Sequence, residues 1–420
     1  MNQEKENQID SMNLKLNYIS NIENKTLQIT GSKSETNRLL ILQALYPNIS
    51  IQNMSNSDDS KLMQKALKST DTIVDIHHAG TAMRFLTAYF AVKEGKETVL
   101  TGSKRMKERP IKILVEALQQ LGCEIRYENE QGYPPIKIQG KSPTINIVSM
   151  QANVSSQYIS ALMLIASKLP NGLEILLEGK VTSVPYINMT LSLLKDVGIE
   201  GNYKNNKITI NHHKEILPNN IVVESDWSSA SYFYSIVALS ENASVTIGSY
   251  KKQSYQGDSS LVEIYKNLGV DTVFNQNTIT IKKTSKNISG FPEALDLSNS
   301  PDIAQTIVVT CFGLGIGCYL TGLHTLKIKE TDRLEALKKE IEKFGGEVSV
   351  TEETLHLKAS SKLTKKDIYV ETYNDHRMAM AFAPLALKTS LCIKDYDVVS
   401  KSYPDFWLDL EKLGFNTSKV

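Results

Sequence analysis

The sequence predicts an α/β protein of two domains, each built from three repeated units that contain two helices and several strands. Its 420 residues exceed what one hydrophobic core ordinarily fills, so two domains are expected. Two interleaved series of helix boundaries also recur along the chain, at a spacing of roughly 73 residues. Repeats of that length are too long for a solenoid, which favours two globular domains of matched design.

The first series consists of amphipathic segments that end in a leucine-rich turn and a glycine. The glycines, which lie 76, 71, 76 and 69 residues apart, are Gly122, Gly198, Gly269, Gly345 and Gly414. Each occupies the position after a helix where a positive φ is favoured. Alternating strand-like runs follow, for example 123–128 with 135–139, and 270–274 with 278–282.

The second series consists of apolar helices that open with small or polar residues. Their starts, separated by 46, 75, 73, 73 and 74 residues, are near Ser34, Gly80, Ser155, Ser228, Pro301 and Asp375. The short first interval predicts a shortened first unit. Ser32 and Glu35 have the spacing of a capping box, and Pro301 and Asp375 are favourable helix starts.

The six units divide naturally into two sets of three, with a boundary near residues 224–227. The chain start precedes the units of the first set, so it is expected to pair with the second set. The predicted domains are therefore 1–28 plus 225–420, which contains both termini, and 29–224, inserted between them. The active site is expected in the cleft between the two domains.

The composition excludes several function classes. A net charge of +1 argues against a nucleic-acid or membrane-surface partner that acts through overall charge. The apolar runs are too short to span a bilayer, and the polar, acidic start of the chain has no signal-peptide pattern. Four cysteines do not form a disulfide scaffold in a chain of this length, and Cys311 and Cys318 have poor metal spacing. A cytoplasmic protein is expected.

Basic and hydroxyl side chains gather at the predicted helix starts. Lys33, Ser34 and Arg38 surround a first helical turn, where free N–H groups and the helix dipole attract anions. Gly80 allows a ligand to approach the backbone closely. Further residues of this kind are Arg105, Lys107, Arg109, Ser155, Ser156, Gln157, Ser183, Lys329, Arg333, Arg377 and Lys401. A multiply charged anion is the expected ligand.

Each of these motifs has a structural alternative. The residues around Lys33 could form an ordinary helix N-cap, and Ser155 and Ser156 could be caps only. Asp332 and Arg333 could be a surface ion pair that contributes little to stability. His376 could be a core histidine with satisfied hydrogen bonds.

Taken together, the motifs resemble the 5-enolpyruvylshikimate-3-phosphate synthase family over about residues 28–406. The segments that carry the resemblance are GSKSETNR, AGTAMRFL, RMKERPI, SSQYISALM, PDIAQT, KETDRLEAL, NDHRMAMAF and KSYPDF. The resemblance implies the enolpyruvyl transferase fold, a two-domain inside-out α/β barrel. Each domain would hold three βαβαββ units, with helices inside and sheets outside.

The resemblance also implies the reaction: the 5-hydroxyl of shikimate 3-phosphate adds to phosphoenolpyruvate and phosphate leaves, a step toward chorismate and the aromatic amino acids. Implied ligands of shikimate 3-phosphate are Lys33, Ser34, Arg38, Ser155, Ser156, Gln157, Ser183, Asp302 and Lys329. Implied ligands of phosphoenolpyruvate are Lys33, Gly80, Arg109, Gln157, Arg333, Arg377 and Lys401. Asp302 is the expected base at the hydroxyl. Glu330 and Lys401, with Lys33, are candidates at C3 and the leaving group. A monomer without metal or cofactor is expected.

The chain departs from the usual family pattern at four positions. His78 replaces Asn, Phe85 replaces Pro, Thr325 replaces an Asn near the shikimate ligand, and Val184 replaces Lys or Arg. These changes affect the expected shape of the phosphoenolpyruvate pocket. Gly80 is kept, and a methyl group there would crowd that pocket, so glyphosate-like anions are expected to enter.

Two other functions compete with this interpretation. One is the enolpyruvyl transferase that acts on a UDP-linked amino sugar, which shares the fold and a base like Asp302. That family carries a reactive Cys in a mobile loop, whereas 104–112 has none and Cys123 is better explained as a core residue. The other is a non-catalytic anion-binding protein, which would not need Asp302, Glu330 and Lys401 beside the arginines.

Overall fold

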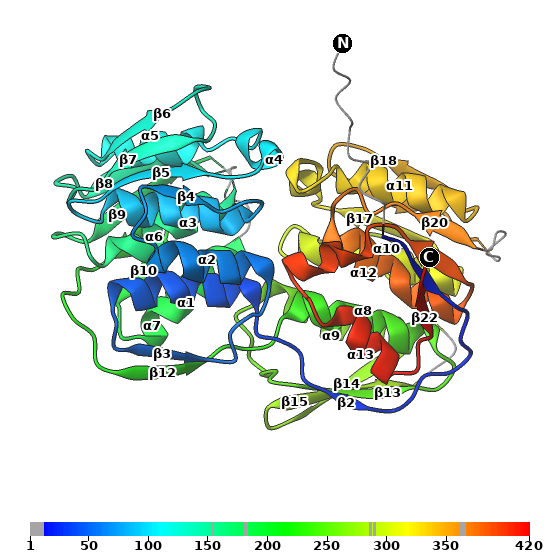
Figure 1. The fold of residues 1–420 in the computed structure, drawn as a ribbon. Helices are drawn as coiled ribbons and strands as arrows, with labels where there is room; N and C mark the ends of the chain where they lie inside the picture. The colour runs from blue at the N-terminus through cyan, green and yellow to red at the C-terminus, as the bar shows by residue number, and fades with distance from the viewer. Residues whose placement is uncertain are drawn as a thin grey trace, which may run out of the picture.

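The computed structural model describes residues 12–152, 155–179, 181, 184–284, 288, 291–360 and 367–420. Within these residues the strands form five four-stranded sheets and one two-stranded sheet. Two halves stand side by side, and in each half helices are enclosed by sheets (Figure 1). This α/β architecture of repeated units agrees with the fold class predicted from the sequence.

One half is built around buried apolar side chains between Leu39 and Val223. Its helices are α1 (Lys33–Leu45), α2 (Asp58–Lys68), α3 (Gly80–Ala91), α4 (Lys104–Lys107), α5 (Lys112–Gln120), α6 (Ser156–Ala166) and α7 (Val184–Asp196). Its strands are β3 (Ile49–Gln52), β4 (Ile73–Asp75), β5 (Glu97–Thr101), β6 (Glu124–Tyr127), β7 (Ile136–Gln139), β8 (Ile147–Gln151), β9 (Leu173–Glu178), β10 (Gly201–Lys204), β11 (Lys207–Ile210) and β12 (Asn219–Val222).

The other half has a core that joins residues 14–29 to residues 227–415. Its helices are α8 (Trp227–Leu239), η1 (Gly257–Ser260), α9 (Leu261–Lys266), η2 (Pro301–Ile303), α10 (Ala304–Leu314), η3 (His324–Ile328), α11 (Arg333–Lys343), α12 (His376–Phe382), η4 (Ala383–Leu387), η5 (Tyr396–Lys401) and α13 (Phe406–Lys412). Its strands are β1 (Leu14–Leu16), β2 (Thr26–Leu27), β13 (Ser244–Gly248), β14 (Val270–Asn275), β15 (Thr278–Lys283), β16 (Leu295–Asp296), β17 (Cys318–Thr321), β18 (Val348–Val350), β19 (Leu355–Leu357), β20 (Ile368–Val370), β21 (Leu391–Ile393) and β22 (Thr417–Lys419).

The units share one design, in which two parallel strands flank a crossover helix. The parallel pairs are β4 with β5, β8 with β9, β16 with β17, and β20 with β21. The first strands of the chain fill places in distant units, because β2 pairs with β13 and β1 lies between β21 and β22. The first unit has only the parallel pair of β3 and β12, which confirms that it is shortened.

Most predicted helix and strand boundaries are confirmed. The five glycines of the first series have positive φ, of 93°, 85°, 76°, 94° and 95° in chain order. The apolar helix predicted to start near Asp375 changes at Ala383 from α12 to the 3₁₀ helix η4, since Pro384 has no N–H for the α-helical pattern. Half of the predicted capping box is present: Ser32 Oγ accepts from the Glu35 N–H, but the Glu35 carboxylate bonds elsewhere.

The chain crosses between the two halves twice, and the crossing segments lie against each other. Gly31 forms a β-bridge with Ser225, and the Ser32 N–H donates to the Glu224 carbonyl (2.7 Å). A side chain at Gly31 would place its Cβ 1.8 Å from the Asn53 carbonyl oxygen, so only glycine fits this crossing. In the described part of the chain, no helix is long and apolar enough to cross a membrane.

Candidate active site

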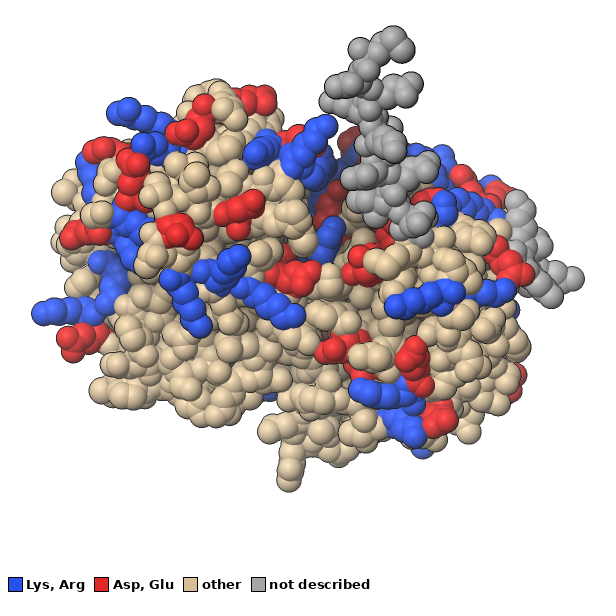
Figure 2. Space-filling view, in the orientation of Figure 1, with Lys and Arg blue, Asp and Glu red and all other residues tan. Residues whose placement is uncertain are grey.

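A cavity of about 850 Å³ lies where the two halves meet, and basic and acidic side chains gather at this junction on the face shown in Figure 2. Eight Lys and Arg side chains and five carboxylates line it, which leaves an excess of positive charge suited to anions. Ser183, a predicted site residue, lies outside the described residues. All other residues that the resemblance assigns to the reaction line the cavity: Lys33, Ser34, Arg38, Gly80, Arg109, Ser155, Ser156, Gln157, Asp302, Lys329, Glu330, Arg333, Arg377 and Lys401. Of the further basic candidates, Arg105 lines it and Lys107 does not.

Helix N-termini from both halves deliver these residues to the cavity. Lys33, Gly80 and Ser156 are the first residues of α1, α3 and α6, and Arg333 opens α11. Ser155 caps α6 through the Gln157 N–H, so it is both a helix cap and part of the cavity wall. Within the described chain no side chain caps α3, so its first N–H groups are available to an anion.

Arg38 is a buried cation held by uncharged groups. Its guanidinium donates to Thr190 Oγ1 (2.8 Å), Ser160 Oγ (2.9 Å) and the Ser34 carbonyl (2.8 Å). Burial lowers the Arg38 pKa to about 10, and the residue stays charged at neutral pH. Because no carboxylate in the described chain lies within ion-pair distance of Arg38, an anion in the cavity would supply its missing counter-charge.

Arg109 lies directly over Gly80. An added Cβ at Gly80 would stand 2.5 Å from Arg109 Nη1, so the absence of a side chain makes room for this guanidinium. Behind it, buried Arg84 donates to the Gly80 carbonyl (3.3 Å) and to the Pro110 carbonyl (3.1 Å), which ties the segment after α4 to α3. The two positions therefore form one unit of the cavity wall.

Arg333 is the centre of an ionic network. Its guanidinium donates to Asp302 Oδ1 (2.9 Å), Glu330 Oε2 (2.9 Å) and Asp375 Oδ2 (2.7 Å), and the residue is 1% exposed. Asp332 instead caps α11 by accepting from the Leu334 and Glu335 N–H groups. The alternative of a surface ion pair between Asp332 and Arg333 is therefore wrong.

Asp302 receives more positive charge than any single ion pair would supply. Lys329 Nζ lies 3.4 Å from Oδ1, and Arg377 Nη2 lies 3.4 Å from Oδ2. Burial opposes ionisation of Asp302, but Arg377, Lys329 and Arg333 outweigh it and hold its pKa well below the usual range. The same balance of burial against Arg333, His376 and Arg109 holds the Glu330 pKa well below its usual range.

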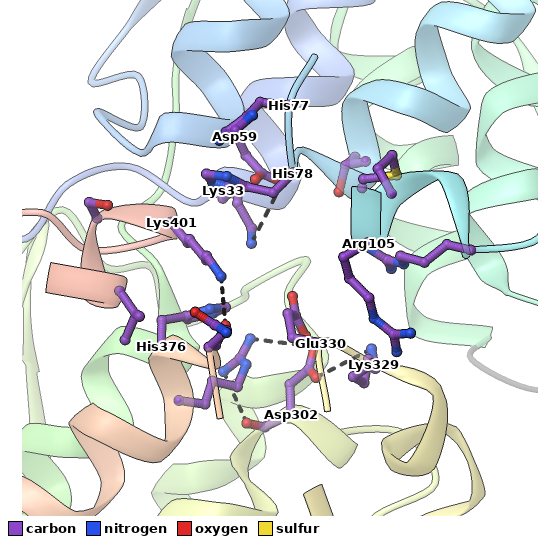
Figure 3. A pocket seen from close by; sticks show the side chains of 18 of the residues that line it. Lys33, Asp59, His77, His78, Arg105, Asp302, Lys329, Glu330, His376 and Lys401 are labelled. Atoms are coloured by element: carbon purple, nitrogen blue, oxygen red, sulfur yellow. Dashed lines mark hydrogen bonds and ion pairs between the residues drawn. The ribbon is translucent and has the colours of Figure 1, made fainter. Parts of the chain in front are cut away.

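The two lysines on the upper and left walls in Figure 3 contact carboxylates less closely than Arg333 does. Lys33 Nζ lies 3.9 Å from Asp59 Oδ2, and Lys401 Nζ donates to the Asn374 carbonyl (2.6 Å). Neither has a short ion pair with a carboxylate within the described residues. Both ammonium groups can therefore turn toward an anion in the cavity.

Several cavity residues were not in the predicted set, and three of them bear on the chemistry of the site. Asp59 at the start of α2 faces Lys33, and the Tyr186 hydroxyl on α7 donates across the halves to Asp302 Oδ2 (3.1 Å). Asp59 has the sequence of an ordinary acidic first turn, so only the fold reveals it. His376 is buried, but neither ring nitrogen has a hydrogen-bond partner among the residues that the structure describes. The alternative of a satisfied core histidine is wrong.

The departures from the family pattern differ in their relation to the cavity. His78 lines it, and burial together with Lys401 lowers its pKa to about 4, so the imidazole is neutral at pH 7. Thr325, Phe85 and Val184 are not lining residues. Cys123 is buried on the core, and burial raises its thiol pKa to about 11, which does not fit a reactive loop cysteine. No group of three or more potential metal ligands occurs among the described residues.

Solved structures with this fold define the class. The EPSP synthase from Acinetobacter baumannii has a TM-score of 0.78 with this chain, at 19% identity, covering 97% of this chain and 100% of that chain. The enolpyruvyl transferase NikO from Streptomyces tendae has a TM-score of 0.73 at 12% identity, with coverage of 98% and 99%. The chain has the enolpyruvyl transferase fold, as predicted, with an anion-attracting cavity between its halves.

Sequence similarity then defines the family. A profile of the family described as EPSP synthase (3-phosphoshikimate 1-carboxyvinyltransferase) matches residues 65–410. The 3-phosphoshikimate 1-carboxyvinyltransferase of Bacteroides fragilis (strain YCH46) is 44% identical over 400 residues, covering 93% of this chain and 95% of that protein. Its counterpart in Haemophilus influenzae (strain PittEE) is 35% identical over 422 residues, with coverage of 92% and 96%. The chain belongs to the EPSP synthase family.

Proposed function

We propose that this protein transfers the enolpyruvyl group of phosphoenolpyruvate to the 5-hydroxyl of shikimate 3-phosphate and releases phosphate. The observation that carries the proposal is the convergence of separate family motifs, from Lys33 to Lys401, on one cationic cavity that also holds Asp302 and Glu330. A binding protein for anions would not need these carboxylates, because they weaken anion binding. A catalyst that moves protons needs them.

Shikimate 3-phosphate is proposed to bind between α1, α6 and the segment that precedes α11. Its phosphate would meet the α6 N-terminus and the uncompensated charge of Arg38, and its ring hydroxyls would meet Asp302 and Lys329. The full proposed set is Lys33, Ser34, Arg38, Ser155, Ser156, Gln157, Ser183, Asp302 and Lys329. Ser34, Ser155, Ser156 and Gln157 support this assignment, because they line the cavity at two helix starts.

Phosphoenolpyruvate is proposed to bind beside it, with its two anionic groups on the arginines. Guanidinium groups pair with carboxylate and phosphate through two parallel hydrogen bonds. The open N-terminus of α3 adds backbone N–H groups at Gly80. The full proposed set is Lys33, Gly80, Arg109, Gln157, Arg333, Arg377 and Lys401.

The proton transfers follow from the chemistry of addition and elimination. Asp302 accepts the proton of the 5-hydroxyl. The hydroxyl oxygen bonds to C2 of phosphoenolpyruvate at the same time, and C3 gains a proton. C3 then loses a proton as the C2–O bond to phosphate breaks. Glu330, Lys401 and Lys33 are the proposed groups at C3 and the leaving phosphate. Bound anions would offset the cations around Asp302 and so restore some of its basicity.

Phosphate release from a mixture of purified protein, shikimate 3-phosphate and phosphoenolpyruvate tests the proposal. Asp302→Asn should lower kcat by about three orders of magnitude while calorimetry still detects shikimate 3-phosphate binding. Binding without turnover by the wild-type protein would favour an anion-binding protein instead. Turnover only with a UDP-linked amino sugar would favour the related transferase.

We also propose that the two cores correspond to two domains, 1–28 plus 225–420 and 29–224, in a cytoplasmic monomer. The separation of buried apolar residues into two clusters supports the domains. The free, buried cysteines Cys123, Cys311, Cys318 and Cys392 fit a reducing compartment. Sedimentation equilibrium at a mass of 46.9 kDa tests the monomer.

A further inference from the structure

Asp258 is a buried carboxyl group that the proposed reaction does not use. It lies on η1, is 7% exposed and is absent from the cavity wall. The helix is pressed against the segment before Pro301, since a Cβ on Gly257 would stand 2.5 Å from the Asn299 carbonyl oxygen. Among the described residues, no Lys or Arg lies within 4.0 Å of this carboxyl, and the Ser228 hydroxyl donates to its Oδ2.

Ser228 connects Asp258 to the active site. Its Oγ accepts from Arg377 Nη2 (3.3 Å) while its own proton points to Asp258. The other end of the same guanidinium donates from Nη1 to the Asp302 carbonyl (3.0 Å). Arg377 therefore lies between Asp302, which lines the cavity, and a hydroxyl whose direction Asp258 fixes.

The pKa of Asp258 depends on the charge of Asp302, and the pKa of Asp302 depends on the charge of Asp258. The charged and titratable groups that face it are Asp302 on η2, Arg377 on α12, Asp226 before α8 and Tyr186 on α7. Burial and repulsion by Asp302 raise the pKa of Asp258 to about 7. The repulsion is mutual, so an ionised Asp258 favours protonation of Asp302.

This effect matters because Asp302 alone is a poor base. Three cations, those of Arg377, Lys329 and Arg333, hold its pKa well below the usual range. A base is most effective when its pKa is near the working pH. A negative charge behind the guanidinium works against the cations without occupying space in the cavity.

We propose that Asp258 is a positioning residue for the transfer reaction, a role that rests on the function proposed above. Through Ser228 it fixes the guanidinium of Arg377, and its negative charge keeps Asp302 basic enough to accept the hydroxyl proton. Asp258 itself touches neither substrate.

The experiment compares Asp258→Asn with the wild-type enzyme across pH 5.5 to 8.5. Asparagine keeps an acceptor for Ser228 but removes the charge. Above pH 7, kcat/KM for shikimate 3-phosphate should fall about tenfold. Below about pH 6, where Asp258 is protonated in the wild type, the two enzymes should converge. Ionisation of the substrate phosphates affects both enzymes equally and cancels in the ratio of variant to wild type.

Two control variants separate charge from packing. Asp409→Asn also removes a buried carboxylate, one that lies on α13 and accepts from Tyr403 and Lys412. The ratio of its kcat/KM to that of the wild type should be near one at every pH. Ser228→Ala keeps the carboxyl group of Asp258 and cuts the link to Arg377, so it should raise KM for phosphoenolpyruvate about fivefold at pH 8.5, where Asp258 is charged.

A ratio for Asp258→Asn that stays constant with pH would overturn the proposal, because a packing defect has that signature. If this variant does not unfold cooperatively, Ser228→Ala carries the test, and an unchanged KM would overturn the link to Arg377. A wild-type protein that releases no phosphate would contradict the proposed function. An active wild type with a constant ratio would contradict the role of Asp258 alone.

Discussion

Two buried arginines in this cavity are accommodated in opposite ways. Arg333 is surrounded by three carboxylates, whereas the partners of Arg38 among the described residues are hydroxyl groups and a carbonyl. The charge of Arg333 is thus compensated without a ligand, and much of its task is to hold Asp302 and Glu330 in place. The charge of Arg38 is not compensated, so it contributes more strongly to anion affinity.

Gly80 controls the position of Arg109, which leads to a residue-scale prediction. Gly80→Ala would place a methyl group 2.5 Å from Arg109 Nη1, and the flexible guanidinium would move. Loss of one charge-assisted hydrogen bond, about 1.5 kcal/mol, should raise KM for phosphoenolpyruvate about tenfold. Steady-state kinetics measure this change, and competition by glyphosate should weaken in parallel.

A double-mutant cycle identifies the cause of that effect. If the methyl group acts by moving Arg109, then Gly80→Ala should have little further effect in an Arg109→Ala background. Additive effects of the two substitutions on KM would contradict this mechanism and would indicate direct contact between the methyl group and the substrate.

At the residue scale, the sequence predicts which residues belong to the site better than it predicts which residues contact one another. The helix-start pattern identifies Lys33 and Arg38 as site residues, because a cation at a helix N-terminus opposes the helix dipole and has little structural use there. Asp302 is identified by the family resemblance. The motifs do not identify Asp59, whose pattern is that of any acidic first turn. Nor do they identify the Tyr186 hydroxyl as a partner of Asp302, because that contact joins residues 116 positions apart.

At the scale of elements, α1 differs most from its sequence signature. The capping-box spacing predicts that Glu35 returns to the Ser32 N–H, yet that N–H donates to the Glu224 carbonyl at the crossing between halves. Glu35 instead accepts from the Glu224 N–H (3.3 Å) and from Gln256 Nε2 (2.9 Å). Hydrogen bonds to Glu224 and Gln256 have replaced the local hydrogen bond between Glu35 and the Ser32 N–H. The spacing of residues within α1 cannot predict contacts with residues so far away in the sequence.

Glu35 therefore makes stability depend on pH. Burial and repulsion by Glu224 raise its pKa from 4.5 to about 7. Between these values Glu35 keeps its proton in the folded protein and has lost it in the unfolded chain. The contribution of Glu35 to the free energy of unfolding is therefore fully present below pH 4.5 and is lost as the pH rises to 7. Relative to Glu35→Gln, the wild type should lose about 3 kcal/mol of unfolding free energy across this range.

Urea unfolding of both proteins at pH 4.5, 6, 7 and 8 measures this difference. The difference should change steeply below pH 7 and remain constant above it. A constant difference across the whole range would mean that Glu35 titrates normally in the folded protein, which its burial at 2% exposure argues against.

At the scale of the whole molecule, polar contacts join the halves around the cavity. Ser400 donates to Asp58 (2.6 Å), and Asn56 donates to Asp405 (2.7 Å). Cations line both walls, with Lys33 and Arg109 from one half and Lys329 and Lys401 from the other. These walls repel each other until an anion lies between them. Without a ligand, the hydrogen bonds between the halves must oppose that repulsion.

Binding of a substrate anion should therefore make the molecule more compact. Saturating shikimate 3-phosphate should lower the radius of gyration measured by small-angle X-ray scattering, because its phosphate screens the walls from each other. Shikimate, which keeps the ring and its carboxylate but lacks the phosphate, is the matched control and should compact the molecule less at saturation. Equal compaction by both ligands would show that the charge of the phosphate is not what draws the halves together. An unchanged radius with bound shikimate 3-phosphate would contradict a closure driven by the relief of charge repulsion.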